Sequence, residues 1–427
     1  MKPEIKQRIE QLNNGKIPKG YKKTDFGVFP SDWETDKTLG DLFDFYGGLS
    51  KSRDELGEEG YAYLHYGDLH RGTFNTVSID HYEQLPKCDI SLTGKEKCLM
   101  KDGDVAFLDA SEDLEGTSRA VLIDNPENKP FIAGLHIIYG KAKNNSLDKW
   151  FKQYITSSES VKKQFQRLSV GFKVYGVNRD TIPRIRVSFP SSLKEQSRIA
   201  EILMKWDKAI ELQDSLITAL EKQIYHNVKS ILLSGIKVWE SRPLSHYLFL
   251  RRETQIPTAD VPLMAFVAFE GISEKGERYD RSQLVKNKNK MYKITHKNDF
   301  IYSSNNLDVG SIGLNKYGTV VISDVYEVFG IKETAIPAVI DKVIQLPRNM
   351  AKIMNYRQGA FYGQYRIHPD DFLKVKVEMP PSDIQKQLAK YIITNELYIK
   401  KLKTRRELLA QQRTTLQQYL LNGIVRV

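Results

Sequence analysis

The sequence of 427 residues has few cysteines and no long apolar segment. Cys88 and Cys98 are too few for a disulfide framework or a cysteine-rich metal site, and they are typical of packed or surface thiols in a reducing cytosol. The longest apolar run, Val261 to Phe269, is far shorter than the about 20 residues that span a bilayer. The first residues also lack the apolar core of a signal peptide. We therefore expect a cytoplasmic protein.

Motifs that carry catalysis are missing as well. Thr93 to Glu96 matches only part of a phosphate-binding Gly-x-x-x-x-Gly-Lys-Ser/Thr loop, and Met379 to Ser382 leads into a helix instead of forming an amino-methyltransferase element. The eight histidines have no metal-ligand spacing, and Asp102 and Asp104 are typical of turn residues. We expect no catalytic residues, no bound metal and no bound cofactor, so the chain is not predicted to be an enzyme by itself.

One long phrase occurs twice. Glu195 to Ile202 is repeated at Ile384 to Tyr391, and Leu232 to Ile236 is repeated at Leu420 to Ile424, with offsets of 188 or 189 residues. Solenoid repeats have periods of about 20–50 residues, so this period is too long for one. The pattern indicates a duplicated domain with an attached helix. A duplicated binding protein suggests a ligand with two similar half-sites.

The segments between the repeated phrases are rich in short β-branched and aromatic runs separated by turn residues, which is typical of strands. We call residues 33–190 head 1 and residues 239–380 head 2, and we expect one helix near 147–168 in head 1. An N-terminal helix and lead-in precede head 1 at residues 1–32. Strands are expected at Tyr61–Leu64, Val105–Leu108, Ala120–Ile123, His136–Tyr139, Leu263–Ala268, Asp299–Tyr302, Thr319–Ile322 and Tyr326–Phe329.

Residues 191–238 and 381–427 carry apolar residues at steps of three and four, the pattern of coiled-coil helices. Each helix would be roughly 60 Å long and needs a partner for its apolar stripe. The order of the chain makes the pair antiparallel. The predicted fold is α+β: two similar mostly-β heads joined by two long antiparallel coiled-coil helices in a pseudo-two-fold dumbbell. The alternative is that each helix packs only on its own head.

Basic residues outnumber acidic residues by 11, which favours a polyanionic partner. Residues 161–179 and 348–368 lack acidic residues, occupy matching places in the two repeats, and mix Lys and Arg with aromatic residues around Gly turns. Lys and Arg neutralise phosphates, and Arg and Gln can bind base edges. A solvated basic face over core aromatics is the alternative. The candidate DNA-binding residues are Lys163, Arg167, Lys173, Tyr175, Asn305, Asn306, Lys352, Arg357, Gln358, Tyr362, Gln364 and Arg366.

Several short segments carry a family likeness: Trp33, Leu39–Leu42, Gly47–Gly48, Gly67–Leu69, Leu193–Ala200, Lys297–Tyr302 and Ile322–Tyr326. In this order, and together with the duplication, they resemble the target recognition domains and helices of the specificity subunit of type I restriction-modification systems. Ile384 departs from the pattern because a Glu is usual there, which removes a carboxylate from the positive end of a helix dipole.

The resemblance implies a non-catalytic subunit in a bacterial defence system. Each recognition domain would read one half of a bipartite target in double-stranded DNA, and the helices would set the spacing and hold two methyltransferase subunits. The methyltransferases would use S-adenosylmethionine, and any restriction (motor) subunit would use ATP with Mg. A different class of function stays open, namely a coiled-coil scaffold whose heads bind protein partners.

Overall fold

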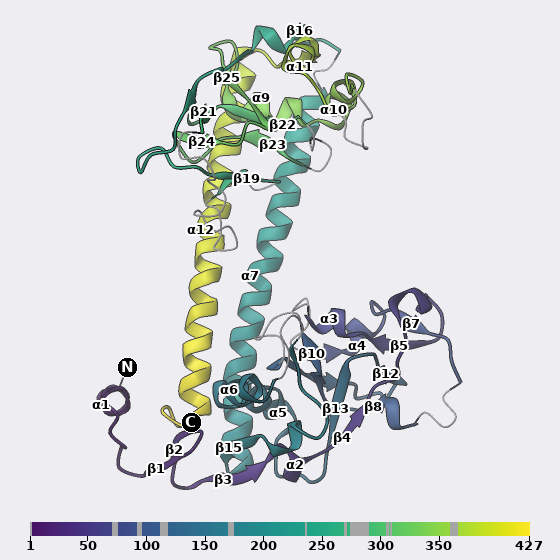
Figure 1. Cartoon of the computed structure of the whole chain (residues 1–427), viewed down its shortest axis with the longest axis vertical. Helices are drawn as coiled ribbons and strands as arrows, with labels where there is room; N and C mark the ends of the chain where they lie inside the picture. Colours follow the sequence, from purple (N-terminus) through teal and green to yellow (C-terminus); the bar gives the residue numbers. More distant parts are fainter. Residues whose placement is uncertain are drawn as a thin grey trace. The chain divides into compact units, whose positions relative to one another are not determined.

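The computed structural model describes most of the chain, and it divides into two compact units (Figure 1). Unit 1 comprises Met1–Leu212 and Arg406–Val427, and unit 2 comprises Gln213–Arg405. Each unit therefore holds one head and one half of each long helix, α7 (Leu193–Ser234) and α12 (Ser382–Leu421). The residues outside the described part are 1, 71–75, 92–95, 112–117, 170–174, 235–236, 269–270, 274–289, 305–306, 308–309 and 359–365.

Head 1 is built on a five-stranded and a four-stranded sheet, and both mix parallel with antiparallel pairs. The strands expected from the sequence form here with nearly the expected bounds. The first sheet has the order β4 (Phe43–Gly47), β13 (Ile137–Ala142), β9 (Val105–Leu108), β11 (Ala120–Asp124) and β6 (Thr76–Ser78). The second has the order β7 (Lys87–Cys88), β5 (Tyr61–Leu64), β12 (Phe131–Ala133) and β8 (Leu99–Met100).

The helix expected near 147–168 forms as two helices, so that prediction is wrong in detail. These are α5 (Lys149–Thr156) and α6 (Glu159–Leu168). The hydroxyls of Thr156 and Ser157 donate to the carbonyls of Lys152 and Gln153 over 2.8 Å in each case, and Ser158 is extended. Ser and Thr side chains that bond to nearby backbone favour helix ends.

Shorter elements complete unit 1. β3 and β15 pair with each other just before α7 begins. β10 pairs with β14, which lies near the carboxyl end of the basic residues 161–179. Their bounds are α1 (Pro3–Asn13), β1 (Tyr21–Thr24), β2 (Gly27–Pro30), β3 (Trp33–Thr38), α2 (Leu39–Leu42), α3 (Tyr66–His70), α4 (Ile79–Tyr82), β10 (Ala110–Ser111), β14 (Tyr175–Gly176) and β15 (Arg186–Pro190).

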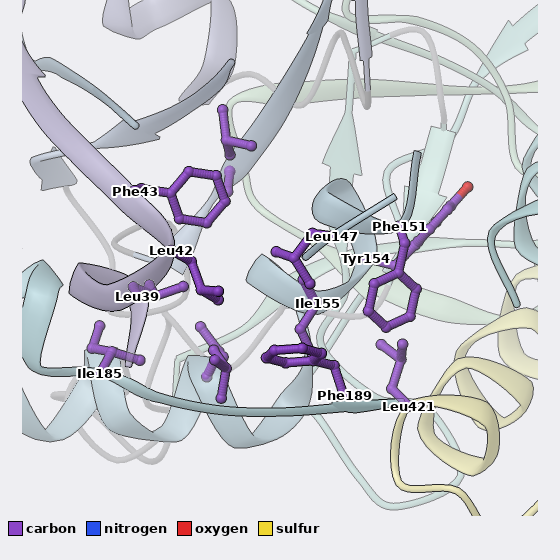
Figure 2. Close-up of a cluster of buried hydrophobic side chains, with 14 of the residues drawn as sticks. Leu39, Leu42, Phe43, Leu147, Phe151, Tyr154, Ile155, Ile185, Phe189 and Leu421 are labelled. Atoms are coloured by element: carbon purple, nitrogen blue, oxygen red, sulfur yellow. The ribbon is translucent and has the colours of Figure 1, made fainter. Parts of the chain in front are cut away.

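The main core of unit 1 joins head 1 to both long helices. Figure 2 shows Phe151 of α5, Phe189 of β15 and Leu421 of α12 among its buried side chains. Ile199 and Leu203 of α7 are fully buried in the same cluster. Burying a large apolar side chain contributes about 1.5–3 kcal/mol, so this cluster holds the helix segments to the head.

Head 2 repeats this plan in unit 2 with antiparallel pairs between its named strands. One sheet has the order β17 (Leu248–Leu250), β25 (Tyr326–Ile331), β22 (Phe300–Ser303) and β23 (Ile312–Leu314), and another has β18 (Thr254–Gln255), β21 (Tyr292–Thr295) and β24 (Val320–Ile322). The remaining elements are β16 (Ser241–Pro243), β19 (Ala265–Val267), β20 (Gly271–Ser273), α9 (Pro337–Ile344), α10 (Pro347–Met354), α11 (Pro369–Lys374) and β26 (Lys376–Glu378).

The long helices run antiparallel within each unit. In unit 1, Arg413 of α12 donates to Asp207 of α7 over 2.7 Å. In unit 2, Lys403 lies 2.8 Å from Glu221, and Asn227 donates to the Tyr391 hydroxyl over 2.9 Å. Residue numbers fall along α12 as they rise along α7, which is the predicted direction. Arg413 therefore makes a specific polar contact between the two helices within unit 1.

The repeated glutamine at the start of each long helix does the same work in both units. The side-chain oxygen of Gln196 accepts from the N–H of Asp148 over 2.8 Å, just before α5. The oxygen of Gln385 accepts from the N–H of Ile336 over 3.0 Å, just before α9. Both glutamines are buried, and their amide groups also donate to the carbonyl that precedes the helix by a few residues. The repeated segment therefore attaches the start of each long helix to its head.

Candidate nucleic-acid interface

The two heads share a backbone arrangement at one end of their sheets. The N–H of Asp109 donates to the carbonyl of His136 over 3.2 Å, and the N–H of Ser304 donates to the carbonyl of Val325 over 3.3 Å. The N–H of Val177, directly after β14, donates to the carbonyl of Asp109 over 2.8 Å. The first basic stretch, residues 161–179, therefore contacts the sheet next to Asp109 through its carboxyl end.

In head 1, the candidate residues of the basic stretch lie on α6 and β14. Lys163 and Arg167 are exposed on α6, and the ammonium group of Lys163 lies 3.5 Å from the carboxylate of Glu159. Tyr175 is half-buried on β14, where it pairs with β10. Lys173 lies outside the described residues. The described candidates thus present two cations on α6 and one aromatic ring on β14.

In head 2, Lys352 lies on α10 close to a carboxylate. Its ammonium group is 3.3 Å from Glu378 of β26, and Arg348 of the same helix also donates to Glu378. This carboxylate offsets part of the positive charge that the sequence places here. Arg357 is half-buried just after α10.

Gln358 and Arg366 pair with each other through both backbone N–H groups, over 2.9 and 3.0 Å. The amide of Gln358 also donates to Asp371 over 2.7 Å. The guanidinium group of Arg366 lies 3.6 Å from the buried Glu327, which also holds Lys293 at 2.6 Å. These two candidates therefore already contact carboxylates of their own head. The remaining candidates outside the described residues are Asn305, Asn306, Tyr362 and Gln364.

A polar and aromatic cluster in head 1 escaped the sequence analysis. β5 and β12 are parallel, and Leu64 and Ala133 at their carboxyl ends are paired. His65 directly follows β5, and His136 follows β12, so both imidazoles come from the same end of the sheet. Asp109 directly follows β9, whose Leu108 pairs with Ile137 of β13, so it reaches this end as well. Only the pairing of the strands brings these three residues to one end of the sheet, and the spacing of residues in the sequence does not show that pairing.

The cluster is connected by short contacts. The imidazole of His136 lies 2.9 Å from Asp109, and its ring meets the ring of Tyr66 edge to face at 5.5 Å. Tyr66 also lies 4.4 Å from the ring of His65. Burial lowers the pKa of His65, and the nearby Arg53 guanidinium lowers it further.

The outer side of the cluster carries an ion pair. Arg53 donates to Asp68 over 3.0 Å, and its side chain is 46% exposed. The side chain of His136 is 44% exposed, and its backbone has a φ of 59°. A left-handed conformation is uncommon outside glycine and often marks a functional constraint.

A second polar network joins head 1 to the helices within unit 1. The Tyr154 hydroxyl of α5 donates to Asp207 of α7 over 2.8 Å, and Arg413 of α12 donates to the same carboxylate. Arg413 also donates to Gln417, whose amide donates to the carbonyl of Ser157 over 3.5 Å. Burial and the Asp207 carboxylate both raise the pKa of Tyr154.

At the matching place in unit 2 there is a cavity of about 650 Å³ between α7, α12 and the turn after α9. Its surface is mostly apolar, and Tyr225, Ile393 and Leu397 around it are more than half exposed. The lysines beside it include Lys229, Lys342 and Lys400. Large exposed apolar patches on a protein surface usually mark contact sites.

Together these features define a duplicated α+β protein whose heads are each attached to an antiparallel helix pair. In the part of the chain that the structure describes, no helix is long and apolar enough to span a bilayer. The same described residues contain no group of three or more His, Cys, Asp or Glu placed to hold a metal ion.

Residues 30–222 match the family model described as "Type I restriction modification DNA specificity domain". A relative from Methanocaldococcus jannaschii, the MjaVIII specificity subunit of a type I restriction enzyme, is 25% identical over 249 residues, which is 54% of this chain and 55% of that protein. The putative MjaX specificity subunit of the same organism is 20% identical over 51% of this chain and 49% of that protein. The chain thus matches about half the length of these curated relatives.

Solved structures share the fold. The type I restriction-modification S subunit from M. genitalium aligns over 91% of this chain and 96% of its own, with a TM-score of 0.53 and 15% identity. A chain from a structure on complex assembly and conformational transition of the type I R-M system aligns over 93% and 99%, with a TM-score of 0.56 and 11% identity. Residues 30–222 are therefore similar to the type I restriction modification DNA specificity domain, and the resemblance inferred from the sequence is confirmed.

Proposed function

We propose that this chain is the DNA-recognition component of a type I restriction-modification complex, in which head 1 and head 2 each read one half of a bipartite target. The duplication of the heads carries this proposal, because two similar binding domains on one chain suit two similar half-sites. The repeated arrangement of Asp109 with His136 and of Ser304 with Val325 supports it, since both heads offer the same frame with different side chains.

The helices are proposed to set the spacing of the half-sites and to bind two methyltransferase subunits. The apolar cavity of unit 2, with Ile393 and Leu397 at its edge, supports the docking role because these side chains are exposed in the isolated chain. In this proposal the partner methyltransferases use S-adenosylmethionine. A restriction subunit, if present, uses ATP with Mg, and this chain supplies no catalytic residue.

A salt titration of DNA binding tests the proposal. The chain with its methyltransferase partner binds a duplex that carries its target, and affinity is measured between 50 and 200 mM salt. Each phosphate contact contributes a slope of about −0.9 to the log–log plot, so several contacts give a steep loss. Mapping of methylated adenines in cells that carry both proteins should return a motif with two separated parts.

The scaffold alternative has one observation in its favour. Lys352 and Arg366 of head 2 contact carboxylates of the same head, which reduces the positive charge available to phosphates, and the amide of Gln358 is already bonded to Asp371. A scaffold that binds protein through its heads would give a flat salt response and no methylated motif. A steep slope together with a two-part motif would reject it.

A further inference from the structure

The cluster at the end of the head 1 sheet has the hydrogen-bonding pattern of a base-reading site. Asp109 supplies a carboxylate acceptor, and the Nδ1–H of His136 donates to this carboxylate, which leaves the other ring nitrogen, Nε2, to contact a base. Both side chains are partly exposed, at 31% and 44%. They lie beside β14, where the first basic stretch meets the sheet. The carboxyl end of the first basic stretch, residues 175–177, therefore adjoins Asp109.

Contacts behind the pair hold it in position. Tyr66 packs edge to face against the His136 ring, and its other neighbour is the ring of His65. His65 is itself fixed, because its ring nitrogen accepts from the N–H of Gly67 over 3.1 Å. A side chain whose orientation is fixed by neighbours loses little entropy when it binds, which suits a recognition residue.

Head 2 has the same backbone arrangement but different chemistry. Ser304 stands in the place of Asp109, and its hydroxyl lies 3.3 Å from the carbonyl of Val325. Val325 stands in the place of His136, and it is 47% exposed. An exposed valine can contact a thymine methyl group, whereas a carboxylate accepts from the amino group of cytosine. The two heads therefore have the same backbone arrangement at these two positions but different side chains on it.

We propose that Asp109 and His136 are specificity-determining residues that read one C·G pair in the half-site of head 1. Asp109 accepts from cytosine N4, and the imidazolium form of His136, whose Nδ1–H donates to Asp109, donates from Nε2 to guanine O6 or N7 in the major groove. Arg53, held by Asp68 at the outer side of the cluster, is the adjacent cation. This inference rests on the proposed function, because it assumes that head 1 binds DNA.

The test uses the full chain together with its methyltransferase partner, and the readout is the methylated motif in cellular DNA. Asp109→Asn replaces an acceptor with a group that also donates, and His136→Asn removes the imidazole while keeping a residue that tolerates a positive φ. We expect discrimination for C·G to fall on the order of tenfold at one position of one half-site. The other half-site should be unchanged. Exchanging head 1 for that of another specificity subunit shows which half-site it reads.

Glu127→Gln is the matched control, because Glu127 forms an exposed ion pair with Lys129 in the turn before β12, at the opposite end of that strand. It should leave the motif unchanged. A motif that both Asn variants leave unchanged overturns the inference while the proposed function stands. Equal weakening on all sequences marks phosphate contact and also overturns it. If Asp109→Asn fails to fold, His136→Asn alone decides. No methylated motif with the parent chain would instead reject the proposed function.

Discussion

The junction between head and helices differs between the two units. In unit 1, Tyr154, Asp207 and Arg413 form a polar network that links α5, α7 and α12. The positions 188 or 189 residues away from these carry Lys342, Glu396 and Ile224 in unit 2.

In unit 2 the matching residues leave the junction open. Ile224 cannot form the ion pair that Arg413 forms, and Glu396 pairs with Lys316 of the head over 2.7 Å instead. Ile224 and Glu396 both lie at the edge of the apolar cavity. The duplicated chain thus has a polar network at the junction of unit 1 and an accessible apolar surface at the junction of unit 2. The difference indicates that contact between helix and head does not require the polar network.

The largest expected effect concerns the open junction. Leu397→Asp should weaken binding of the methyltransferase subunit at unit 2 by more than about 100-fold, because desolvating a carboxylate in an apolar contact costs several kcal/mol. Leu397 is 54% exposed, so stability of the free chain should hardly change. Binding is measured by calorimetry with the purified partner. Lys208→Asp, at the matching position in unit 1, is the control, and equal losses in both variants would contradict a contact specific to the cavity.

Removing the Arg413 side chain from the polar network should destabilise unit 1. Arg413→Ala leaves the mostly buried carboxylate of Asp207 without its cation, so the free energy of unfolding should fall by about 2–3 kcal/mol. Lys403→Ala breaks an exposed pair and should cost at most about 0.5 kcal/mol. Urea unfolding of both variants measures the difference. If the double variant Asp207→Leu/Arg413→Leu is as unstable as Arg413→Ala, the unpaired charge is not the cause.

Much of the fold was accessible from sequence because its signals are local and repeated. The apolar steps of 191–238 and 381–427 predict α7 and α12, whose first residues lie within two residues of 191 and 381 and whose last residues are Ser234 and Leu421. The strands of head 1 follow from short apolar runs between turn residues. The single helix at 147–168 was wrong because side-chain hydroxyls at Thr156 and Ser157 end α5, and such bonds depend on rotamers that the sequence does not show.

The candidate site was less accessible, because its chemistry depends on residues that are distant in the chain. The positive charge of Lys352 is offset by Glu378, and that of Arg366 by Glu327. Neither partner is near in sequence to the basic residue it contacts. Nothing in the sequence around His136 marked it as a site residue, because it reaches the cluster only through the parallel pairing of β5 and β12. Charge runs can therefore suggest a binding face but not the net charge it presents.

The glutamines that anchor the helices allow a finer comparison of the two junctions. Gln196 makes three hydrogen bonds to head 1 and the preceding turn, whereas two are found for Gln385 in unit 2. Gln196→Met should cost about 2 kcal/mol and Gln385→Met about 1 kcal/mol, because buried backbone groups lose their partners. Thermal unfolding of both variants measures the order. Equal costs, or a larger cost in unit 2, would show that the bonds do not set the stability of the junction.

The smallest expected effect concerns two matched aspartates. Asp104 and Asp299 occupy the same turn in the two heads, where each accepts from the N–H three residues earlier, over 2.8 and 2.7 Å. Burial raises the pKa of Asp104 to about 6. Burial also raises the pKa of Asp299, although Arg251 donates to its carboxylate over 2.8 Å.

Because the folded pKa of Asp104 lies above its unfolded value of 3.8, its favourable contribution is complete below about pH 4 and is lost as the pH rises through about 6. Asp104→Asn stays neutral, so its stability relative to the parent should rise by about 1 kcal/mol between pH 5 and pH 7. Asp299→Asn loses the Arg251 ion pair and should destabilise the chain at pH 7. Free energies of unfolding measured across this range test both variants. A pH-independent difference for Asp104→Asn would mean that the carboxyl group does not titrate there.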